Sequence, residues 1–428
     1  MLIQFNFSNH KSFREEASLD LTATGISELK NHIFKVGKEN ILPVSVIYGA
    51  NASGKSNVIE AFKYMRYYVM TSFGYDLSNV SNEKGGFLSP PYFVFDKDSK
   101  NKESCYEVYF IIKEEMNGRE FVNTYNYGFT VDKTGIVEEW LNSKAKTSND
   151  YKEIFYRNEN KNILDLNKIP KKQRENIKVS IRKETLILSL GDRLKVDILK
   201  KVYDWFRKSE VIDFGSAFEV LVRESSLPRG FVDDGKVKKN VINYLKTFDN
   251  DIVDFRIEKG AVDEDGIDRY MIDSIHKSVD SDDLFSIPLS HESSGTLKMF
   301  SLYQYIMDVL DNGGVLFIDE LNSRLHPIML ANIIQTFTNK DINRNGAQLI
   351  ITTHDVSQLD TKLFRRDEIW FTKKSTGHSE LYSLADFEDL NGKKIRKDEN
   401  YLKNYLLGKY GAIPNIKNIE LPSEVHYD

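Results

Sequence analysis

Residues 49–56 read Gly49-Ala50-Asn51-Ala52-Ser53-Gly54-Lys55-Ser56 and match the pattern G-x-x-x-x-G-K-[ST] without a gap. The two glycines let the backbone turn tightly, so that successive N–H groups face inward and surround a phosphate. The loop opens a helix, whose positive N-terminal end also favours anions. Lys55 supplies a positive charge to the β- and γ-phosphates, and the hydroxyl of Ser56 is placed to ligate Mg²⁺. The stretch therefore predicts a site for a nucleoside triphosphate.

The residues on both sides of this loop support that interpretation. A phosphate-binding loop must follow a buried strand and precede a helix. Residues 42–48 (LPVSVIY) are apolar and β-branched, and residues 57–69, starting at Asn57, have apolar side chains at helical spacing. We therefore expect Gly49, Asn51, Asn57 and the residues between Asn51 and Asn57 to bind the nucleotide.

Composition excludes several classes of protein. The chain has 428 residues, a formal net charge of −5 and one cysteine, Cys105. The charge gives no overall nucleic-acid signature, and one cysteine excludes an internal disulfide framework and suits a reducing compartment. No signal peptide and no apolar run long enough to span a membrane is visible. We expect a soluble, cytoplasmic protein without a membrane partner.

The N-terminal part predicts strands around the phosphate loop. Residues 2–7 and 17–21 alternate apolar and polar side chains and predict a hairpin. Three further β-rich runs, at residues 92–95, 106–112 and 124–131, predict an antiparallel sheet, with Asn117-Gly118 as a hairpin turn.

Residues 140–250 predict a helical insertion. Lysine, asparagine and glutamate increase there, and apolar residues recur at helical spacing in residues 198–206 and 237–248. A lysine-rich cluster between Lys168 and Lys183 fits a nucleic-acid patch or a solvated helical face, and acidic residues favour the second interpretation. Two short strands are expected at residues 254–258 and 269–272, followed by an acidic loop.

The C-terminal part predicts the rest of the site. Residues 313–319 (GGVLFID) form an apolar strand that ends in Asp319 and Glu320; the first acid would hold Mg²⁺ and the second would orient a water molecule. A small-residue turn with Ser293, Ser294 and Gly295 opens the helix expected at residues 297–310 and is both a cap and an anion site. A further strand, residues 348–352, leads to His354, near the edge where open α/β sheets bind ligands.

These segments together resemble the ABC-class ATPases of the chromosome-maintenance, recombination-repair and OLD-type proteins. The stretches "YGANASGKSNVIEAFKYM", "ESSGTLKMFSLYQYI", "FIDELNSRLHP" and "IITTHD" are similar to the bacterial AAA15/AAA21-type ATP-binding proteins. The resemblance implies an α/β, ABC-type P-loop fold with a mixed central sheet, an antiparallel β lobe and a helical insertion. We expect residues 1–135 and 286–390 to be the two halves of the ATPase domain. The insertion would span residues 136–285 and a tail residues 391–428.

The resemblance also implies a mechanism. Two subunits would meet head to tail around ATP and Mg²⁺, forming a homodimer or a higher homo-oligomer. The loop from Gly49 to Ser56 of one subunit would face Ser293, Ser294 and Gly295 of the other. Asp319 would support Mg²⁺, Glu320 would be the catalytic base and His354 would sense the γ-phosphate. Lys11 and Ser12 resemble an N-terminal turn that helps to hold the phosphates.

At three places the chain departs from the family pattern from which these roles are taken. The signature reads Glu-Ser-Ser-Gly-Thr, which favours the OLD-like branch over transporters; Asn322 replaces a frequent Asp; and no glutamine before Gln173 fits the usual glutamine loop.

The resemblance favours an ATP-driven sensor in anti-phage defence or abortive infection. It would control a separate effector, such as a Toprim-type or RloB-like nuclease, with nucleic acid or a phage protein as trigger. One alternative is a DNA-repair ATPase of the RecF/Rad50-like type that acts directly on DNA. Another is a structural scaffold in which ATP only locks a dimer, with negligible turnover.

Overall fold

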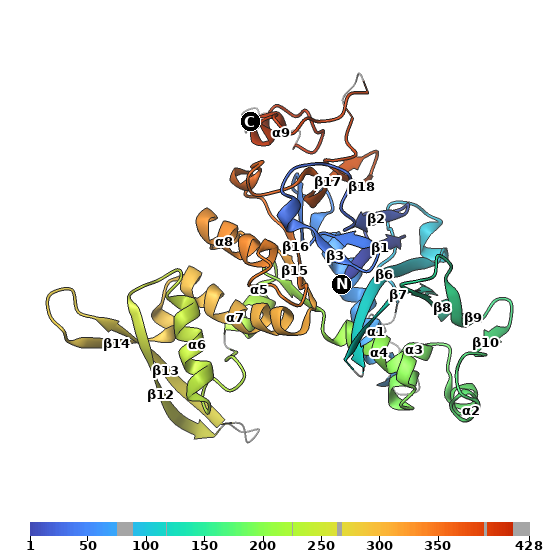
Figure 1. Cartoon of the computed structure of the whole chain (residues 1–428), viewed down its shortest axis with the longest axis horizontal. Helices are drawn as coiled ribbons and strands as arrows, with labels where there is room; N and C mark the ends of the chain where they lie inside the picture. Colours follow the sequence, from blue (N-terminus) through green and yellow to red (C-terminus); the bar gives the residue numbers. More distant parts are fainter. Residues whose placement is uncertain (75–88, 117, 225, 263–267, 389–391, 414–428) are drawn as a thin grey trace, which may run out of the picture.

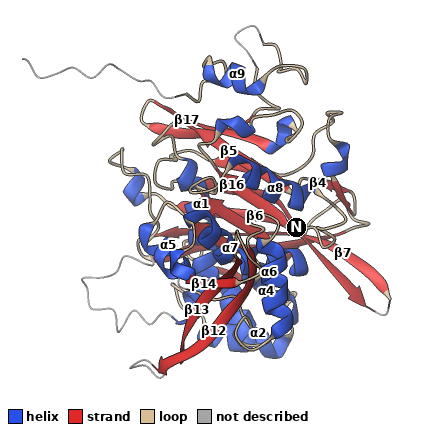
Figure 2. Cartoon of the chain, turned by 90° about the vertical axis from the view of Figure 1, so that its left-hand side faces the viewer, coloured by secondary structure: helices blue, strands red, loops and turns tan. Residues whose placement is uncertain are grey.

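The computed structural model describes residues 1–74, 89–116, 118–224, 226–262, 268–388 and 392–413 (Figure 1). At its centre lies a sheet of order β11-β15-β16-β5-β17-β18. All neighbouring strands are parallel except the last pair, β17 and β18. The strands span Glu210–Asp213 (β11), Val315–Asp319 (β15), Gln348–Thr352 (β16), Val44–Gly49 (β5), Ile369–Ser375 (β17) and His378–Ser383 (β18). Figure 2 shows β5, β16 and β17 running side by side.

Helices cover both faces of this sheet. Every residue of β5 is buried, as the apolar run predicts for a central parallel strand. Because successive side chains point to opposite faces, Ile47 packs into a core with α1 (Lys55–Thr71), whereas Val46 and Tyr48 face a second core. That second core contains α7 (Ser294–Asn312) and α8 (Pro327–Thr338). The predicted strand-loop-helix unit around the phosphate loop is confirmed.

An antiparallel sheet packs on the α1 side, with the order β10-β9-β8-β7-β6-β1-β2. The hairpin of β1 (Leu2–Ser8) and β2 (Ala17–Asp20) is confirmed, as is the pairing of β6 (Ser104–Met116) with β7 (Arg119–Asp132). In the turn between β6 and β7, Asn117 lies outside the described residues. The strand predicted at residues 92–95 is wrong: this segment forms a loop, and Val94 and Phe95 are exposed instead of pairing in a sheet.

The expected helical insertion is only partly helical. The sheet continues past residue 135 through β8 (Gly135–Ala145), β9 (Lys152–Asn158) and β10 (Ile163–Asp165). Alternate positions of β8, such as Leu141, are buried, a period-2 pattern that the lysine-rich composition obscures. The chain then forms β11, which is the edge strand of the central sheet, and four helices before α6. The helices are α2 (Lys171–Ser180), α3 (Ile187–Arg193), α4 (Asp197–Arg207) and α5 (Ala217–Glu224). The helices predicted at residues 198–206 and 237–248 are confirmed as α4 and α6 (Gly235–Leu245).

A small sheet extends to the side opposite the antiparallel lobe (Figure 1). It consists of β12 (Ile252–Val262), β13 (Asp268–Lys277) and β14 (Leu284–Pro288). The first two strands were expected, although they are longer than the sequence predicts; β14 was not, since all five of its residues are exposed and show no buried face. A short hairpin, β3 (Phe34–Val36) and β4 (Glu39–Ile41), and the C-terminal α9 (Tyr401–Leu406) complete the regular elements named here. No helix in the described ranges has the length and apolar character that crossing a membrane requires.

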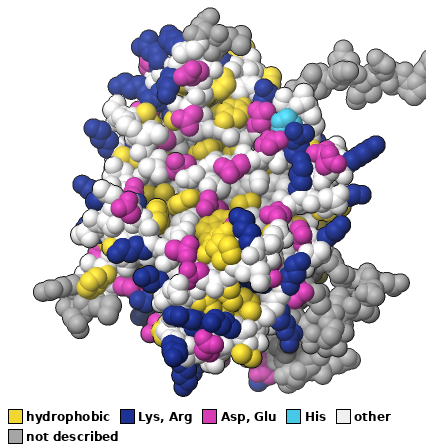
Figure 3. All heavy atoms as spheres, turned by 90° about the vertical axis from the view of Figure 1, so that its right-hand side faces the viewer, with side chains coloured by type: hydrophobic (Ala, Val, Ile, Leu, Met, Phe, Trp, Pro, Cys, Tyr) yellow, Lys and Arg dark blue, Asp and Glu magenta, His cyan; other side chains and the backbone are white. Residues whose placement is uncertain are grey.

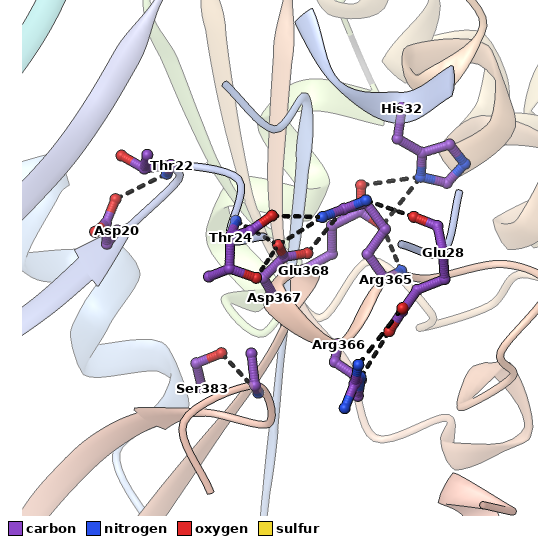
Figure 4. Close-up of polar contacts among 11 residues, drawn as sticks. Asp20, Thr22, Thr24, Glu28, His32, Arg365, Arg366, Asp367, Glu368 and Ser383 are labelled. Carbon is purple, nitrogen blue, oxygen red and sulfur yellow. Dashed lines mark hydrogen bonds and ion pairs between the residues drawn. The ribbon is translucent and has the colours of Figure 1, made fainter. Parts of the chain in front are cut away.

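A buried polar network fixes the segment after β2 to the start of β17 (Figure 4). Arg365 is fully buried and donates to both carboxylate oxygens of Asp367 at 2.9 and 2.8 Å. His32 lies 3.0 Å from Glu368, and Arg366 donates to Glu28 at 2.6 Å. Burial raises the pKa of Glu368, and the contact with His32 partly offsets this. The network therefore holds the N-terminal segment beside the strands that carry the site.

Candidate nucleotide-binding site

The phosphate loop runs from the end of β5 to the start of α1 and is packed between distant segments. Gly54 has φ +109°, and a Cβ there would lie 2.6 Å from Ser379 Oγ and 2.9 Å from Ser12 Oγ. The hydroxyls of Ser53 and Thr372 are 2.6 Å apart. Only glycine fits this conformation and this close approach, so the second glycine of the pattern is a geometric requirement.

The side chain of Lys55 folds back into the phosphate loop. Its Nζ donates to the carbonyl oxygens of Gly49 and Ala50 at 2.9 and 3.0 Å. Burial lowers the pKa of Lys55 to about 8, although the nearby carboxylates of Asp319 and Glu320 oppose this. The ammonium group is therefore held in place where it could meet a phosphate.

Asp319 ends β15 beside Ser56. It is 5% exposed, accepts a hydrogen bond from Thr352 Oγ1 and contacts the hydroxyl of Ser56. Burial raises its pKa, whereas these two hydrogen bonds lower it. A buried carboxylate next to a hydroxyl is the oxygen donor set that suits Mg²⁺ completed by phosphate and water, so Asp319 and Ser56 fit the expected ion.

Glu320 and His354 meet at the carboxyl edge of the sheet. Glu320 has φ +52°, and its N–H donates to Thr352 Oγ1 at 2.9 Å. His354 Nε2 lies 3.6 Å from Glu320 Oε1, and the backbone N–H of His354 donates to Asn322 Oδ1 at 3.2 Å. Burial and then Lys55 lower the pKa of His354, with Glu320 opposing, so the imidazole is neutral at neutral pH.

A cavity of about 760 Å³ lies between the phosphate loop, Glu320 and His354. Its lining includes eight predicted nucleotide-site residues together with Glu320 and His354; the eight are Lys11, Ser12, Asn51, Ala52, Gly54, Lys55, Ser56 and Asn57. Ser12 Oγ accepts hydrogen bonds from Asn57 Nδ2 and Ser379 Oγ, both at 2.7 Å. Lys11 forms an ion pair with Glu60 on α1. The N-terminal turn therefore borders the phosphate loop.

The same cavity has a wall that the sequence does not predict. Tyr92, Phe95 and Lys374 line it, and Lys374 Nζ lies 4.9 Å from the centre of the Phe95 ring. The aromatic residues belong to the segment predicted to be a strand, and Lys374 comes from β17. In the sequence these aromatic residues cannot be told from core residues. Only the folded structure shows that they line the cavity.

The carboxyl end of β11 adds another unpredicted group. Asp213 lies opposite Asp319 in the parallel register, and burial together with Asp319 raises its pKa. A Cβ on Gly215 would lie 3.7 Å from Glu320 Cδ. The turn after β11 thus lies against the acidic pair, although it contains no glutamine.

One part of the predicted site lies outside the cavity. This is the signature turn, formed by Ser293, Ser294 and Gly295 at the start of α7. Ser293 caps α7, with its Oγ accepting from the N–H of Thr296 at 3.1 Å, so the predicted helix cap is confirmed. Ser293 and Ser294 are exposed, and a Cβ on Gly295 would lie 3.2 Å from Arg324 O. None of the three lines the cavity.

The fold and these motifs define an ABC-type P-loop ATPase, with the phosphate loop, the Asp-Glu pair and the histidine at one edge of a mostly parallel sheet. A family model described as "AAA domain, putative AbiEii toxin, Type IV TA system" matches residues 44–360. The chain belongs to this family, and the predicted resemblance to AAA21-type ATP-binding proteins is confirmed.

Solved structures of chromosome-maintenance heads are similar to the chain. One is the SmcHead bound to the C-winged helix domain of ScpA, at 12% identity and a TM-score of 0.40, covering 89% of this chain and 97% of that one. Another is the Smc head domain with an extended coiled coil bound to the C-terminal domain of ScpA from Pyrococcus furiosus (13%, 0.38, 89% and 96%). A third is the Smc head domain with a coiled coil and joint from Pyrococcus yayanosii (11%, 0.40, 92% and 98%). No curated protein matches the chain.

Proposed function

We propose that this chain binds ATP with Mg²⁺ in the cavity and hydrolyses it. The observation that supports this most strongly is the meeting of Lys55, Asp319, Glu320 and His354 at one edge of the sheet, around the phosphate loop. A cleft that brings a phosphate cradle, a metal-ligating carboxylate and a general base together is suited to phosphoryl transfer to water.

Each residue has a role in this proposal. The N–H groups of the loop and Lys55 bind the phosphates, and Ser56 and Asp319 hold Mg²⁺, which neutralises phosphate charge when it is bound. Glu320 accepts the proton of the attacking water. His354, whose neutral ring has one N–H to donate, contacts the γ-phosphate. Tyr92 and Phe95 offer aromatic faces for the base.

A second copy of the chain would complete the site. Ser293, Ser294 and Gly295 are presented at the start of α7 but do not line the cavity of their own chain. The helix start is suited to an anion, so we propose that it contacts the γ-phosphate bound by a partner subunit. ATP would then hold two copies together, and its hydrolysis would release them.

We further propose that this cycle controls a separate effector protein in anti-phage defence. The support is the family description, which names a toxin of toxin–antitoxin systems. A nuclease remains the proposed effector, and nucleic acid or a phage protein the proposed trigger. The alternative, a repair ATPase acting directly on DNA, would instead show turnover that depends on DNA ends.

The first test is the assembly mass and ATP turnover of wild type and Glu320→Gln, with and without Mg-ATP. The variant is expected to bind ATP, lose hydrolysis and accumulate as a dimer or higher assembly. Ser294→Arg on the Glu320→Gln background serves as the matched control, because it blocks the signature turn and should prevent assembly while ATP still binds. Hydrolysis by Glu320→Gln at the wild-type rate would exclude Glu320 as the base.

A further inference from the structure

The segment from Lys168 to Lys183 is strongly basic. It contains one acidic residue, Glu175, and seven basic ones, which are Lys168, Lys171, Lys172, Arg174, Lys178, Arg182 and Lys183. Its formal charge is therefore +6, whereas the whole chain carries −5, so the remaining residues together carry −11. The acidic residues that favoured an ordinary solvated face are almost absent from the segment itself.

The structure exposes six of these seven basic residues to solvent, and the seventh, Arg174, is half-buried. Ile177 is the buried residue that anchors α2, while Lys168, Lys171 and Lys172 are exposed. Among the described residues no ion pair involves these three lysines; Glu175 pairs with Lys178 at 3.2 Å. Arg174 donates to backbone carbonyls of Asn167 and Ile169 at 3.0 and 3.1 Å, so no carboxylate neutralises it there.

The spacing places three of the four basic residues of the helix on one side of it. Lys171, Arg174 and Lys178 are three and four residues apart, so they share a face. Lys168 lies three residues before the first residue of the helix, and Arg182 and Lys183 follow the helix after Ile181. The helix lies at the outer end of the antiparallel lobe, beside β10 (Figure 1). Figure 3 views this side of the molecule and shows several Lys and Arg side chains at its lower end.

We propose that this basic face binds the phosphate backbone of duplex nucleic acid. Dense exposed positive charge is the footprint of phosphate contacts. The segment 168–183 contains no aromatic residue, so it offers no platform on which single-stranded bases could stack. A membrane surface is a poorer match, because Val179, 87% exposed, is the one large apolar side chain of the segment that the structure shows at the surface.

None of residues 168–183 lines the nucleotide cavity, so duplex binding can be measured independently of ATP turnover. The binding itself goes beyond the proposed function; only its use as a nucleic-acid trigger rests on that function. Loss of ATP hydrolysis in Glu320→Gln would leave duplex binding intact, and loss of the basic face would leave basal turnover intact.

The test is fluorescence anisotropy of the full-length chain with labelled duplexes of about 20 base pairs, one of DNA and one of RNA, over a salt series. The triple variant Lys168→Ala/Lys171→Ala/Lys172→Ala is expected to bind at least about tenfold more weakly. Its slope of log affinity against log salt should be shallower by about 2 to 3, since each lost phosphate contact removes about one unit. The two duplexes distinguish DNA from RNA as the source of the phosphate backbone.

A matched control removes the same charge elsewhere. Lys236, Lys239 and Lys246 are exposed on or directly after α6, on the other side of the molecule. Their triple alanine variant should bind duplexes like wild type. The proposal is overturned if both triple variants lose affinity equally, if the α2 variant binds like wild type, or if wild type binds neither duplex at low salt. Preferential binding to phosphatidylserine–phosphatidylcholine vesicles would overturn it in favour of a membrane partner.

Discussion

Lys55 shows how one residue combines charge with burial. Its ammonium group is enclosed by the phosphate loop and donates to two backbone carbonyls, and burial lowers its pKa to about 8. The carboxylates of Asp319 and Glu320 keep that pKa from falling further. A bound phosphate would favour the charged form in the same way. The charge state of Lys55 is thus tied to occupation of the site.

The affinity for ATP should therefore depend on pH. Below about pH 8 the free protein already carries the charge on Lys55, but at higher pH the lysine must take up a proton when ATP binds. The Kd of ATP, measured by calorimetry, should rise by up to about tenfold per pH unit above that value. Lys55→Arg keeps its charge throughout this range, so its affinity, whatever its level, should lack this trend. A flat profile in wild type would contradict the assignment.

His354 is expected to act on turnover more than on binding. It lies 3.6 Å from Glu320 and is neutral at neutral pH, so its ring can donate one hydrogen bond to developing charge on the γ-phosphate. His354→Ala should lower kcat by about 100-fold or more, with ATP still bound. The control is His326→Ala, which removes a histidine that caps α8 and does not line the cavity. Equal loss in both variants would indicate a general structural effect.

At the scale of residues, the sequence predicts the groups that a local pattern carries. The phosphate loop, Asp319 and Glu320 each follow an apolar strand within a few positions, so spacing alone identifies them. Tyr92, Lys374 and Asp213 come from three separate segments, and only folding brings them to the cavity or its acidic edge. No local pattern marks such residues, because their position beside the cavity depends on contacts between distant parts of the chain.

Among the elements, β18 and the N-terminal turn pack so closely against the phosphate loop that position 54 must be glycine. Gly54→Ala would introduce a Cβ 2.6 Å from Ser379 Oγ at φ +109°. The positive φ alone costs an L-residue about 1–2 kcal/mol, and the clash displaces the loop. ATP binding should be lost while the fold persists, as circular dichroism and nucleotide titration would show.

Gly25→Ala is the matched control for that variant. A Cβ at position 25 would meet no other atom within 4 Å, and Gly25 has no positive φ. The same chemical change should therefore leave ATP binding unaltered. Normal binding by Gly54→Ala would mean that the loop tolerates a side chain and that the packing described here is not required.

Elements with a clear period were predicted well, whereas those with a mixed pattern were not. The buried strands β5, β15 and β16 and the helices α1, α4 and α7 follow their apolar spacing. In β8 and β9 polar side chains such as Glu139 and Arg157 occupy buried positions, so the alternation was obscured and the segment was expected to be helical. The exposed strand β14 has no buried face at all, and hence no signal in hydrophobic spacing.

At the scale of the molecule, Glu139 links the antiparallel lobe to the helices behind it. Its buried carboxylate on β8 accepts hydrogen bonds from the N–H groups of Ile187 and Leu188 at 2.7 and 3.1 Å, at the start of α3. Arg157 lies 4.0 Å away. Burial raises the pKa of Glu139 to about 7 from its ordinary value of 4.5, despite these favourable contacts.

This pKa makes the stability of the whole fold depend on pH. Between pH 4.5 and about 7 the folded chain holds a proton on Glu139 that the unfolded chain has released, so the free energy of unfolding falls as pH rises through this window. Below pH 4.5 the protonated carboxyl group makes its full contribution to the free energy of unfolding. About 3 kcal/mol of this free energy is lost once the pH has risen above about 7. Buried His10, with a pKa lowered to about 3, acts in the opposite sense below its ordinary value of 6.5, because the unfolded chain binds the extra proton.

The two effects separate when wild type is compared with Glu139→Gln, since His10 contributes equally to both. Urea unfolding from about pH 5 to pH 8 should show the wild type losing stability relative to the variant as pH rises, with most of the change between about pH 5 and pH 7 and little above pH 8. The variant cannot release a proton, so the difference between the two curves isolates the carboxyl group. Parallel curves would mean that Glu139 is ionised throughout, and that Arg157 and the two N–H donors outweigh its burial.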